Sequence, residues 1–198
     1  NGEVTVRVYT PLMRCSAQMP VVVLLHGGGF VFGSSSDTTS SFVASTVLSE
    51  TGAVVVSVEY RLAPEHPCPA AVNDTAAVIE WVLSGQLGEH TNTSHVVALG
   101  IEAGGNLAAV AAAMLARKNT AQPLFGLVCV HPWFLRHDTS SRARFKDTTM
   151  LYGARLDWLE SLYNPEGACR PELVDPTLAE GGLEGMPPTH VFTCGVCR

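Results

Sequence analysis

The stretch VVVLLHGGGF occupies residues 21–30 and joins a short apolar run directly to three glycines. Continuous apolar runs of this length, rich in β-branched residues, are typical of strands buried on both faces of a parallel sheet. Glycines just after such a strand let the backbone turn sharply and present bare N–H groups. A phosphate-binding loop or a plain turn also uses glycines, but neither explains His26 before them or Phe30 after them. We therefore predict an oxyanion-binding loop over residues 26–30.

Short β-branched runs alternate along the chain with segments that carry apolar residues at helical spacing. This alternation is typical of an α/β fold, in which helices cover both faces of a mostly parallel sheet. We therefore expect a three-layer α/β sandwich. The predicted strands are 4–9, 21–25, 54–58, 95–99, 124–130 and 189–196; the predicted helices are 41–50, closed by Thr51-Gly52, then 70–83, 106–117 and one containing 155–163. The region 131–187 is otherwise predicted as an irregular excursion of the kind that borders a lid or an active site.

The 198 residues are 46% hydrophobic and 15% charged, which suits one domain over 1–198 with a sizeable core. The net charge is −6 and the basic residues are scattered, so nucleic acid is not an expected partner. The apolar stretches are shorter than the roughly 20 residues that cross a membrane, so no membrane span is expected. The oligomeric state stays open.

Six cysteines lie at irregular spacings: Cys15, Cys68, Cys129, Cys169, Cys194 and Cys197. They do not form the framework of a small disulfide-rich secreted protein, and most are predicted to fill the core. The Cys-x-x-Cys sequence at 194–197 stands without a second pair, so no metal site is predicted. Asn73 and Asn92 begin Asn-x-Ser/Thr sequences, which accept carbohydrate only in a secretory setting. No signal peptide is recognisable, and we expect a cytoplasmic protein.

The stretch GIEAGGN, at residues 100–106, makes a tight junction between a predicted strand and a predicted helix. Small residues flank the central Glu102, as they must where one residue sits in a strained turn. The next N–H, that of Ala103, is then placed at a helix N-terminus, where it can complete an oxyanion hole. The segment has the shape of a nucleophile elbow, but a carboxylate stands where the nucleophile would be.

The stretch EYRLAPEHP, at residues 59–67, leaves another predicted buried strand and brings charged groups toward the same region. Residue type alone would allow Glu65 or His66 a catalytic role. Ion pairs that brace loops are much commoner, so we expect structural work from this segment.

These three segments together resemble the hormone-sensitive-lipase-type family of α/β-hydrolases, whose members carry His-Gly-Gly-Gly-Phe, Tyr-Arg-Leu-Ala-Pro-Glu and Gly-Asp-Ser-Ala-Gly-Gly-Asn in this order. The resemblance runs over essentially the whole chain, from Asn1 through 131–133 to 186–188. It implies an α/β-hydrolase scaffold and, by descent, hydrolysis of small acyl esters without a cofactor or metal. Complete members are longer at both ends, so the resemblance implies a core without an N-terminal lid and without the last strand and helix.

Carried over position by position, the resemblance puts Glu102 in the place of the nucleophilic serine, with Ile101 replacing the aspartate before it. The nearest match to the triad acid is Cys197, and the triad histidine lies downstream of this chain. His131-Pro132-Trp133 is placed after a core strand, where packing is favoured over catalysis. The implied oxyanion donors are Gly28, Gly29 and Ala103, and the implied pocket or structural residues are His26, Gly27, Phe30, Gly104, Gly105, Asn106, Asp74 and Glu65.

Ester hydrolysis on this scaffold needs a hydroxyl activated by a histidine that an acid orients. Loss of such a triad costs about 10⁶ in turnover in a well-studied protease, so we predict negligible esterase activity. Direct attack by Glu102 on an alkyl carbon would need a water-activating base, which none of the seven histidines obviously supplies. We predict instead that Glu102 accepts the oxyanion donors and plugs the pocket.

Two other functions stay open at this point. A non-enzymatic protein could hold an acyl ester or a related apolar ligand in the former pocket, because a hydrolase scaffold can host binding roles. A degenerate product without function is the third alternative, and an exposed sheet edge with poor solubility would favour it.

Overall fold

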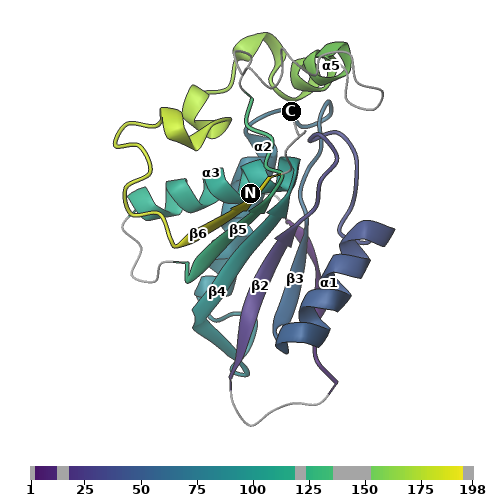
Figure 1. Ribbon diagram of the computed structural model, residues 1–198, viewed down its shortest axis with the longest axis vertical. Coiled ribbons are helices and arrows are strands. Elements are labelled where there is room, and N and C mark those ends of the chain that lie inside the picture. Colours follow the sequence, from purple (N-terminus) through teal and green to yellow (C-terminus); the bar gives the residue numbers. More distant parts are fainter. Residues whose placement is uncertain (1–2, 13–17, 119–123, 136–152, 194–198) are drawn as a thin grey trace.

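The computed structural model describes residues 3–12, 18–118, 124–135 and 153–193. Within these ranges, one six-stranded sheet has the order β1-β3-β2-β4-β5-β6 (Figure 1). β1 pairs with β3 in antiparallel register, and the other neighbouring pairs are parallel. The strands are β1 (Thr5–Tyr9), β2 (Met19–Leu25), β3 (Val54–Glu59), β4 (Thr91–Ile101), β5 (Gly126–Val130) and β6 (Thr189–Phe192).

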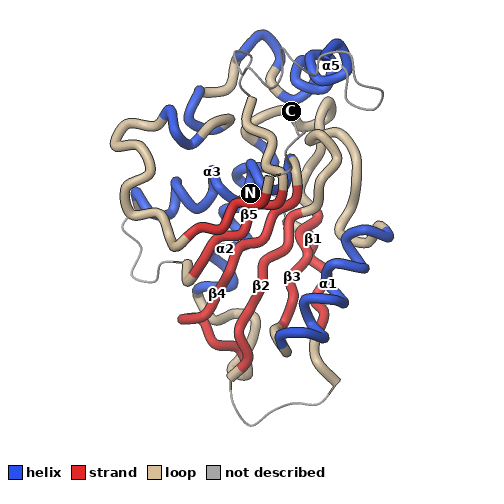
Figure 2. Tube along the Cα trace, in the orientation of Figure 1, coloured by secondary structure: helices blue, strands red, loops and turns tan. Residues whose placement is uncertain are grey.

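Helices cover both faces of this sheet. α1 (Thr38–Thr51) packs against β1 and β3 on one face, where Ala44 belongs to a small apolar cluster. α2 (Ala70–Leu83) and α3 (Ala103–Arg117) pack on each other over the opposite face, which holds the main core. The helices on either side of the strands are visible in Figure 2. The predicted α/β fold with a mostly parallel sheet is therefore confirmed.

The observed helix and strand ends differ from the predicted ones for local reasons. α1 begins at Thr38 rather than at residue 41 because Asp37 caps it: Asp37 Oδ1 accepts the Ser40 N–H at 2.7 Å. The helix stops where predicted, at Gly52, whose φ of 66° is left-handed. β4 is longer than the predicted 95–99 because its amino end runs on to pair Thr91 with Met19.

The region predicted as an irregular excursion contains one helix and several single turns within its described part. α5 (Gly153–Tyr163) includes the predicted helical residues 155–163. Three short 3-10 helices follow, η1 (Pro165–Gly167), η2 (Pro171–Leu173) and η3 (Pro176–Leu178). Each starts with a proline, whose fixed φ suits a first helical position.

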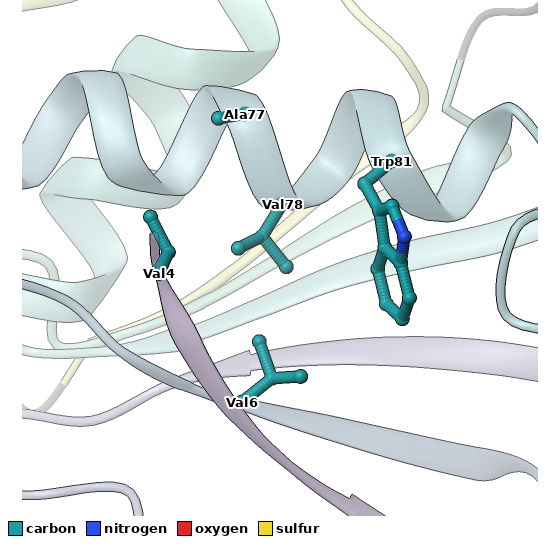
Figure 3. A pocket seen from close by; sticks show the side chains of 5 residues that line it. All are labelled: Val4, Val6, Ala77, Val78 and Trp81. Atoms are coloured by element: carbon teal, nitrogen blue, oxygen red, sulfur yellow. The ribbon is translucent and has the colours of Figure 1, made fainter. Parts of the chain in front are cut away.

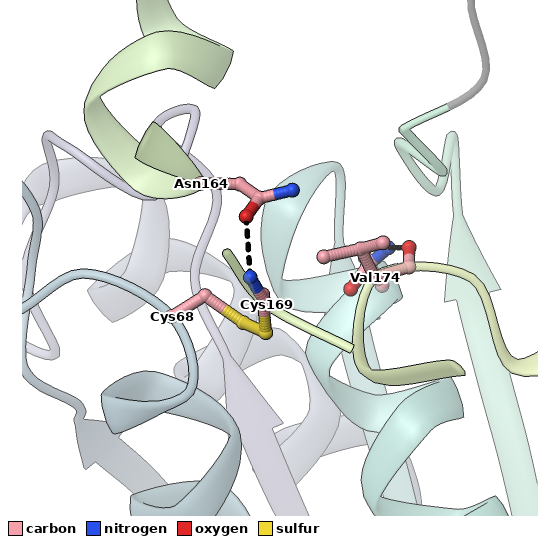
Figure 4. The surroundings of a disulfide bond; sticks show 5 residues. Cys68, Asn164, Cys169 and Val174 are labelled. Carbon is pink, nitrogen blue, oxygen red and sulfur yellow. Dashed lines mark hydrogen bonds between the residues drawn. A yellow bond between two sulfur atoms is a disulfide. The ribbon is translucent and has the colours of Figure 1, made fainter. Parts of the chain in front are cut away.

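Two of the cysteines predicted to fill the core do lie in or against it, but they are also joined by a disulfide that was not predicted. Cys68, just before α2, and Cys169, just before η2, form a disulfide with their Cα atoms 5.8 Å apart (Figure 4). They are 101 residues apart in the chain, and spacing alone cannot reveal such a pairing. For Cys129, a buried free thiol, the core prediction is confirmed. Cys15, Cys194 and Cys197 lie outside the described residues.

One apolar groove lies between α2 and the amino end of β1, which pairs with the carboxyl end of β3 (Figure 3). Val4, just before β1, and Val6 of β1 face Val78 and Trp81 of α2 across it. None of the helices in the described residues is both long enough and apolar enough to cross a membrane.

Candidate active site at the carboxyl ends of the strands

The parallel strands β2, β3, β4 and β5 end at the same edge of the sheet, and the loops that leave them converge there. Figure 1 shows α5 above this edge. Ligands of open α/β sheets bind at such an edge because loops from neighbouring strands meet there. The segments predicted to carry chemistry all follow these strands.

The glycine loop after β2 adopts a backbone that only small or strained residues tolerate. Gly28 has φ 128° and Gly29 has φ 62°, and Phe30 shares the left-handed region with φ 65°. A Cβ on Gly28 would lie 2.1 Å from the Phe32 carbonyl oxygen, so no side chain fits there. The Gly28 carbonyl accepts the Phe32 N–H at 2.9 Å, which closes the turn. The loop therefore turns its N–H groups toward β4.

The elbow after β4 has the strained backbone that the sequence predicted. Glu102 has φ 53° and ψ −111°, and α3 starts at the next residue. Its small neighbours are required by space: a Cβ on Gly100 would lie 2.1 Å from the Gly104 oxygen, and one on Gly104 would lie 2.3 Å from the Leu25 oxygen. Glu102 is thus held at the point where β4 passes into α3, directly beside the end of β2.

The Glu102 carboxylate accepts the two N–H groups of the glycine loop. Its Oε2 lies 2.7 Å from the Gly28 nitrogen and 3.0 Å from the Gly29 nitrogen. Gly27 leaves the room for this contact, since a Cβ there would lie 3.2 Å from Oε2. No hydrogen bond from the Ala103 N–H to the carboxylate is present in the described residues; Ala103 is buried as the first residue of α3. Two of the three predicted donors therefore bind Glu102.

His26 packs beneath the loop rather than beside the carboxylate. Its ring stacks on Tyr60 with centroids 4.2 Å apart, and its Nδ1 lies 2.8 Å from the Gly27 oxygen. Nδ1 must carry a proton there, because a carbonyl can only accept. Burial lowers the pKa of His26 below its usual 6.5, although the Gly27 carbonyl and nearby carboxylates act in the opposite direction. His26 is therefore a neutral structural residue at pH 7.

Hydrogen bonds tie the segment after β3 to α2, and the end of β3 to the glycine loop. Buried Asp74 of α2 accepts the Arg61 N–H at 3.0 Å and its guanidinium at 2.7 Å. Glu59 Oε2 accepts the Ser35 N–H at 2.7 Å, which fixes the end of the glycine loop. The side chain of Glu65 is exposed, and no hydrogen bond or ion pair joins it to another described residue, so the expected brace does not come from it.

α5 supplies residues that sequence reasoning missed. The Leu159 side chain closes over Gly29, where a Cβ would lie 2.8 Å from its Cδ1. Tyr163 stacks on Phe30 with ring centroids 3.9 Å apart, and Trp133 lies 5.5 Å from the same ring. Burial raises the pKa of Tyr163, so its hydroxyl stays protonated. Nothing in the spacing of 155–163 marks these contacts, because the two segments are distant in the chain.

Asn106 and Gly105 tie α3 to its surroundings. The fully buried Asn106 donates from Nδ2 to the Val174 carbonyl at 2.6 Å. A Cβ on Gly105 would lie 3.1 Å from Pro132, so the helix approaches the end of β5 closely. Among the described histidines, none hydrogen-bonds the Glu102 carboxylate. The predicted triad-acid position, Cys197, lies outside the described residues, as does the rest of the Cys-x-x-Cys sequence.

Comparison with known proteins agrees with this geometry. A family model described as alpha/beta hydrolase fold matches residues 22–197. Carboxylesterase NlhH of Mycobacterium tuberculosis is 35% identical over 96% of this chain and 60% of its own length. Tuliposide A-converting enzyme 2 of Tulipa gesneriana is 34% identical over 67% of this chain and 36% of its own length.

A solved esterase structure from the archaeon Pyrobaculum calidifontis matches with a TM-score of 0.85 and 33% identity, over 98% of this chain and 61% of that one. The chain thus spans less than two thirds of the length of each of these relatives. The family model, which covers most of the chain, and the elbow beside the glycine loop lead to one conclusion: this chain belongs to the alpha/beta hydrolase family.

Proposed function

We propose that this chain is the core of a carboxylesterase-type alpha/beta hydrolase whose own ester-hydrolysing site is disabled by Glu102. The observation that carries the proposal is the contact of Glu102 Oε2 with the N–H groups of Gly28 and Gly29. Donors in this arrangement stabilise the oxygen that becomes negative during acyl transfer. Here a permanent carboxylate accepts the same donors, so an ester carbonyl would have to displace it.

With Glu102 at the elbow, the site also lacks the serine hydroxyl that would attack an ester. A serine at the elbow would supply a hydroxyl, whereas the carboxylate oxygen that faces the donors has its negative charge stabilised by two hydrogen bonds. Such stabilisation weakens a nucleophile, because the charge that would form the new bond is already shared with donors. Within the described residues, no histidine lies in hydrogen-bond contact with Glu102 to activate a water. Ester hydrolysis and covalent carboxylate chemistry are therefore both disfavoured.

The second candidate function is binding of a small ligand in the former acyl site. One observation favours it: the other carboxylate oxygen, Oε1, makes no hydrogen bond among the described residues, and Glu102 is partly exposed. A carboxylate anchored by one oxygen and open at the other can accept a donor from a ligand. The wall of the site is apolar, with Leu159 beside Gly29.

Hydrolysis of p-nitrophenyl butyrate tests the proposal. The proteins to compare are wild type, Glu102→Ser and Glu102→Ala, each at this length and with any native downstream segment restored. We expect wild type and Glu102→Ala to be inactive at both lengths and the extended Glu102→Ser protein to hydrolyse the ester. Circular dichroism must first show that each variant folds. Turnover by wild type that disappears in Glu102→Ala would show that Glu102 is a working catalytic group and would overturn the proposal.

A further inference from the structure

The Cys68–Cys169 disulfide lies in the folded core and does not join two exposed thiols. Cys169 is 7% exposed, and its N–H donates to Asn164 Oδ1 at 2.9 Å (Figure 4). The Cys68 N–H donates to the Tyr163 carbonyl at 2.8 Å. The two segments thus meet through one backbone hydrogen bond, from Cys68 to Tyr163, as well as through the disulfide. Disulfides form and persist in oxidising compartments and are rare in the cytosol, so this bond weighs against the cytoplasmic location expected from the sequence.

An independent feature of the surface points to the same kind of compartment. Asn92, Thr93 and Ser94 form a carbohydrate-acceptor sequence at the amino end of β4. Asn92 is partly exposed and Ser94 is exposed. The Ser94 N–H donates to Asn92 Oδ1 at 3.0 Å, a local turn that holds the carboxamide in place. Asn92 Nδ2, the atom that bonds to carbohydrate, has no hydrogen-bond partner among the described residues.

The second acceptor sequence, at 73–75, differs in the folded protein. It lies inside α2, where Thr75 is fully buried and its hydroxyl donates to the Ala71 carbonyl at 2.8 Å. Asp74 between them is also buried and holds Arg61. The hydroxyl that an acceptor sequence must present is therefore unavailable after folding. Asn92 alone of the two keeps its whole acceptor sequence at the surface.

The position of Asn92 leaves room for a bulky group. It stands near the amino end of β4, and Glu102 follows the carboxyl end. At about 3.3 Å per strand residue, the two lie roughly 30 Å apart. The flanking residues 88–90 and 95 are exposed as well. Carbohydrate at Asn92 would project into solvent at the edge of the sheet opposite the candidate site and would not obstruct it.

We propose that Asn92 is an N-glycosylation site, modified in the same oxidising compartment in which the Cys68–Cys169 disulfide forms. In the reaction, Nδ2 loses a proton and bonds to the anomeric carbon of a lipid-diphosphate-linked oligosaccharide, and the lipid diphosphate leaves. The inference is independent of the activity proposed for Glu102.

Peptide mapping of the full-length protein from its source cells tests the proposal. Free thiols are alkylated without reduction, and the digest is analysed before and after treatment with peptide N-glycosidase. We expect the Asn92 peptide as a glycopeptide that the enzyme converts to the aspartate form, together with linked Cys68 and Cys169 peptides. An unmodified Asn92 peptide overturns the proposal, whether the two cysteines are linked or are recovered alkylated.

Matched variants of the full-length protein, produced in the same cells, separate this site from others. Asn92→Gln and Ser94→Ala should both remove the glycosidase-sensitive shift in electrophoretic mobility that belongs to this site. Thr93→Ala, which alters the middle position only, should retain it. If the shift persists undiminished in Asn92→Gln, the carbohydrate lies elsewhere and the assignment to Asn92 is wrong.

Discussion

Glu102 Oε2 lies 2.7 Å from the Gly28 nitrogen, although 74 residues separate the two in the chain. They meet because β2 and β4 are adjacent parallel strands, so the loops that follow them leave the sheet side by side. The Gly28 and Gly29 N–H groups are suited to an oxygen that becomes negative only during a reaction. Here the carboxylate oxygen of Glu102 occupies them instead. The same contact links the loop that follows β2 to the elbow that follows β4.

Replacing Glu102 by alanine and by glycine should separate the carboxylate's hydrogen bonds from the strain of its backbone. Both variants lose the two bonds, and we expect each to unfold at lower urea concentration than wild type. A positive φ costs a residue with a side chain about 1–3 kcal/mol, so Glu102→Gly should be more stable than Glu102→Ala by about 1 kcal/mol. The control is exposed Ala77 in α2, where Ala77→Gly should be destabilising by about 1 kcal/mol. Glycine less stable than alanine at both positions would show that the elbow is unstrained.

Removal of the disulfide should lower the free energy of unfolding substantially. The bond closes a long loop, and loss of a native disulfide typically costs about 2–5 kcal/mol. We expect urea unfolding of the Cys68→Ser/Cys169→Ser protein to match that of reduced wild type. Addition of dithiothreitol should destabilise wild type and leave the double variant unchanged, although both retain the buried Cys129. Equal sensitivity of the two proteins to the reductant would contradict the disulfide's stabilising role.

Gly104→Ala should prevent or severely weaken folding. The added Cβ would lie 2.3 Å from the Leu25 carbonyl oxygen, a backbone atom that cannot move aside without disturbing β2. Overpacking typically costs about 1–3 kcal/mol and occasionally more, and a clash with backbone belongs at the upper end of this range. Gly126→Ala is the matched control, since its Cβ would lie 3.6 Å from the nearest atom, an ordinary contact. Soluble expression and thermal denaturation measure both, and a stable Gly104→Ala protein would mean that α3 starts farther from β2.

His26 should make the protein less stable as the pH falls. Burial lowers the pKa of His26 in the folded state below 6.5, so below about pH 6.5 the unfolded chain binds a proton that the folded one resists. The contribution of neutral His26 to the free energy of unfolding is therefore fully present above this pH. It declines as the pH falls toward the pKa of His26 in the folded state. We expect His26→Gln to flatten the decline in unfolding free energy between pH 7 and pH 5. His66→Gln, at an exposed position, should keep the slope of wild type, and an unchanged slope in His26→Gln would contradict the assignment.

Local patterns in the sequence predicted most of the fold. The apolar run at 21–25, the Gly52 stop and the helical spacing of 70–83 each report the environment of their own segment, since burial and backbone conformation act over a few residues. The strained elbow at Glu102 was predictable for the same reason, because Gly100 and Gly104 already limit the residues that can surround it.

Tertiary structure decided which of these segments meet. Sequence spacing alone does not pair Cys68 with Cys169 or place Leu159 over Gly29, because the order of strands in the sheet and the path of α5 bring them together. The sequence determined the chemistry available at the elbow, a carboxylate in place of a hydroxyl. Only the fold decided that this carboxylate reaches the Gly28 and Gly29 N–H groups, since hydrogen bonds depend on distances between atoms that the chain itself holds far apart.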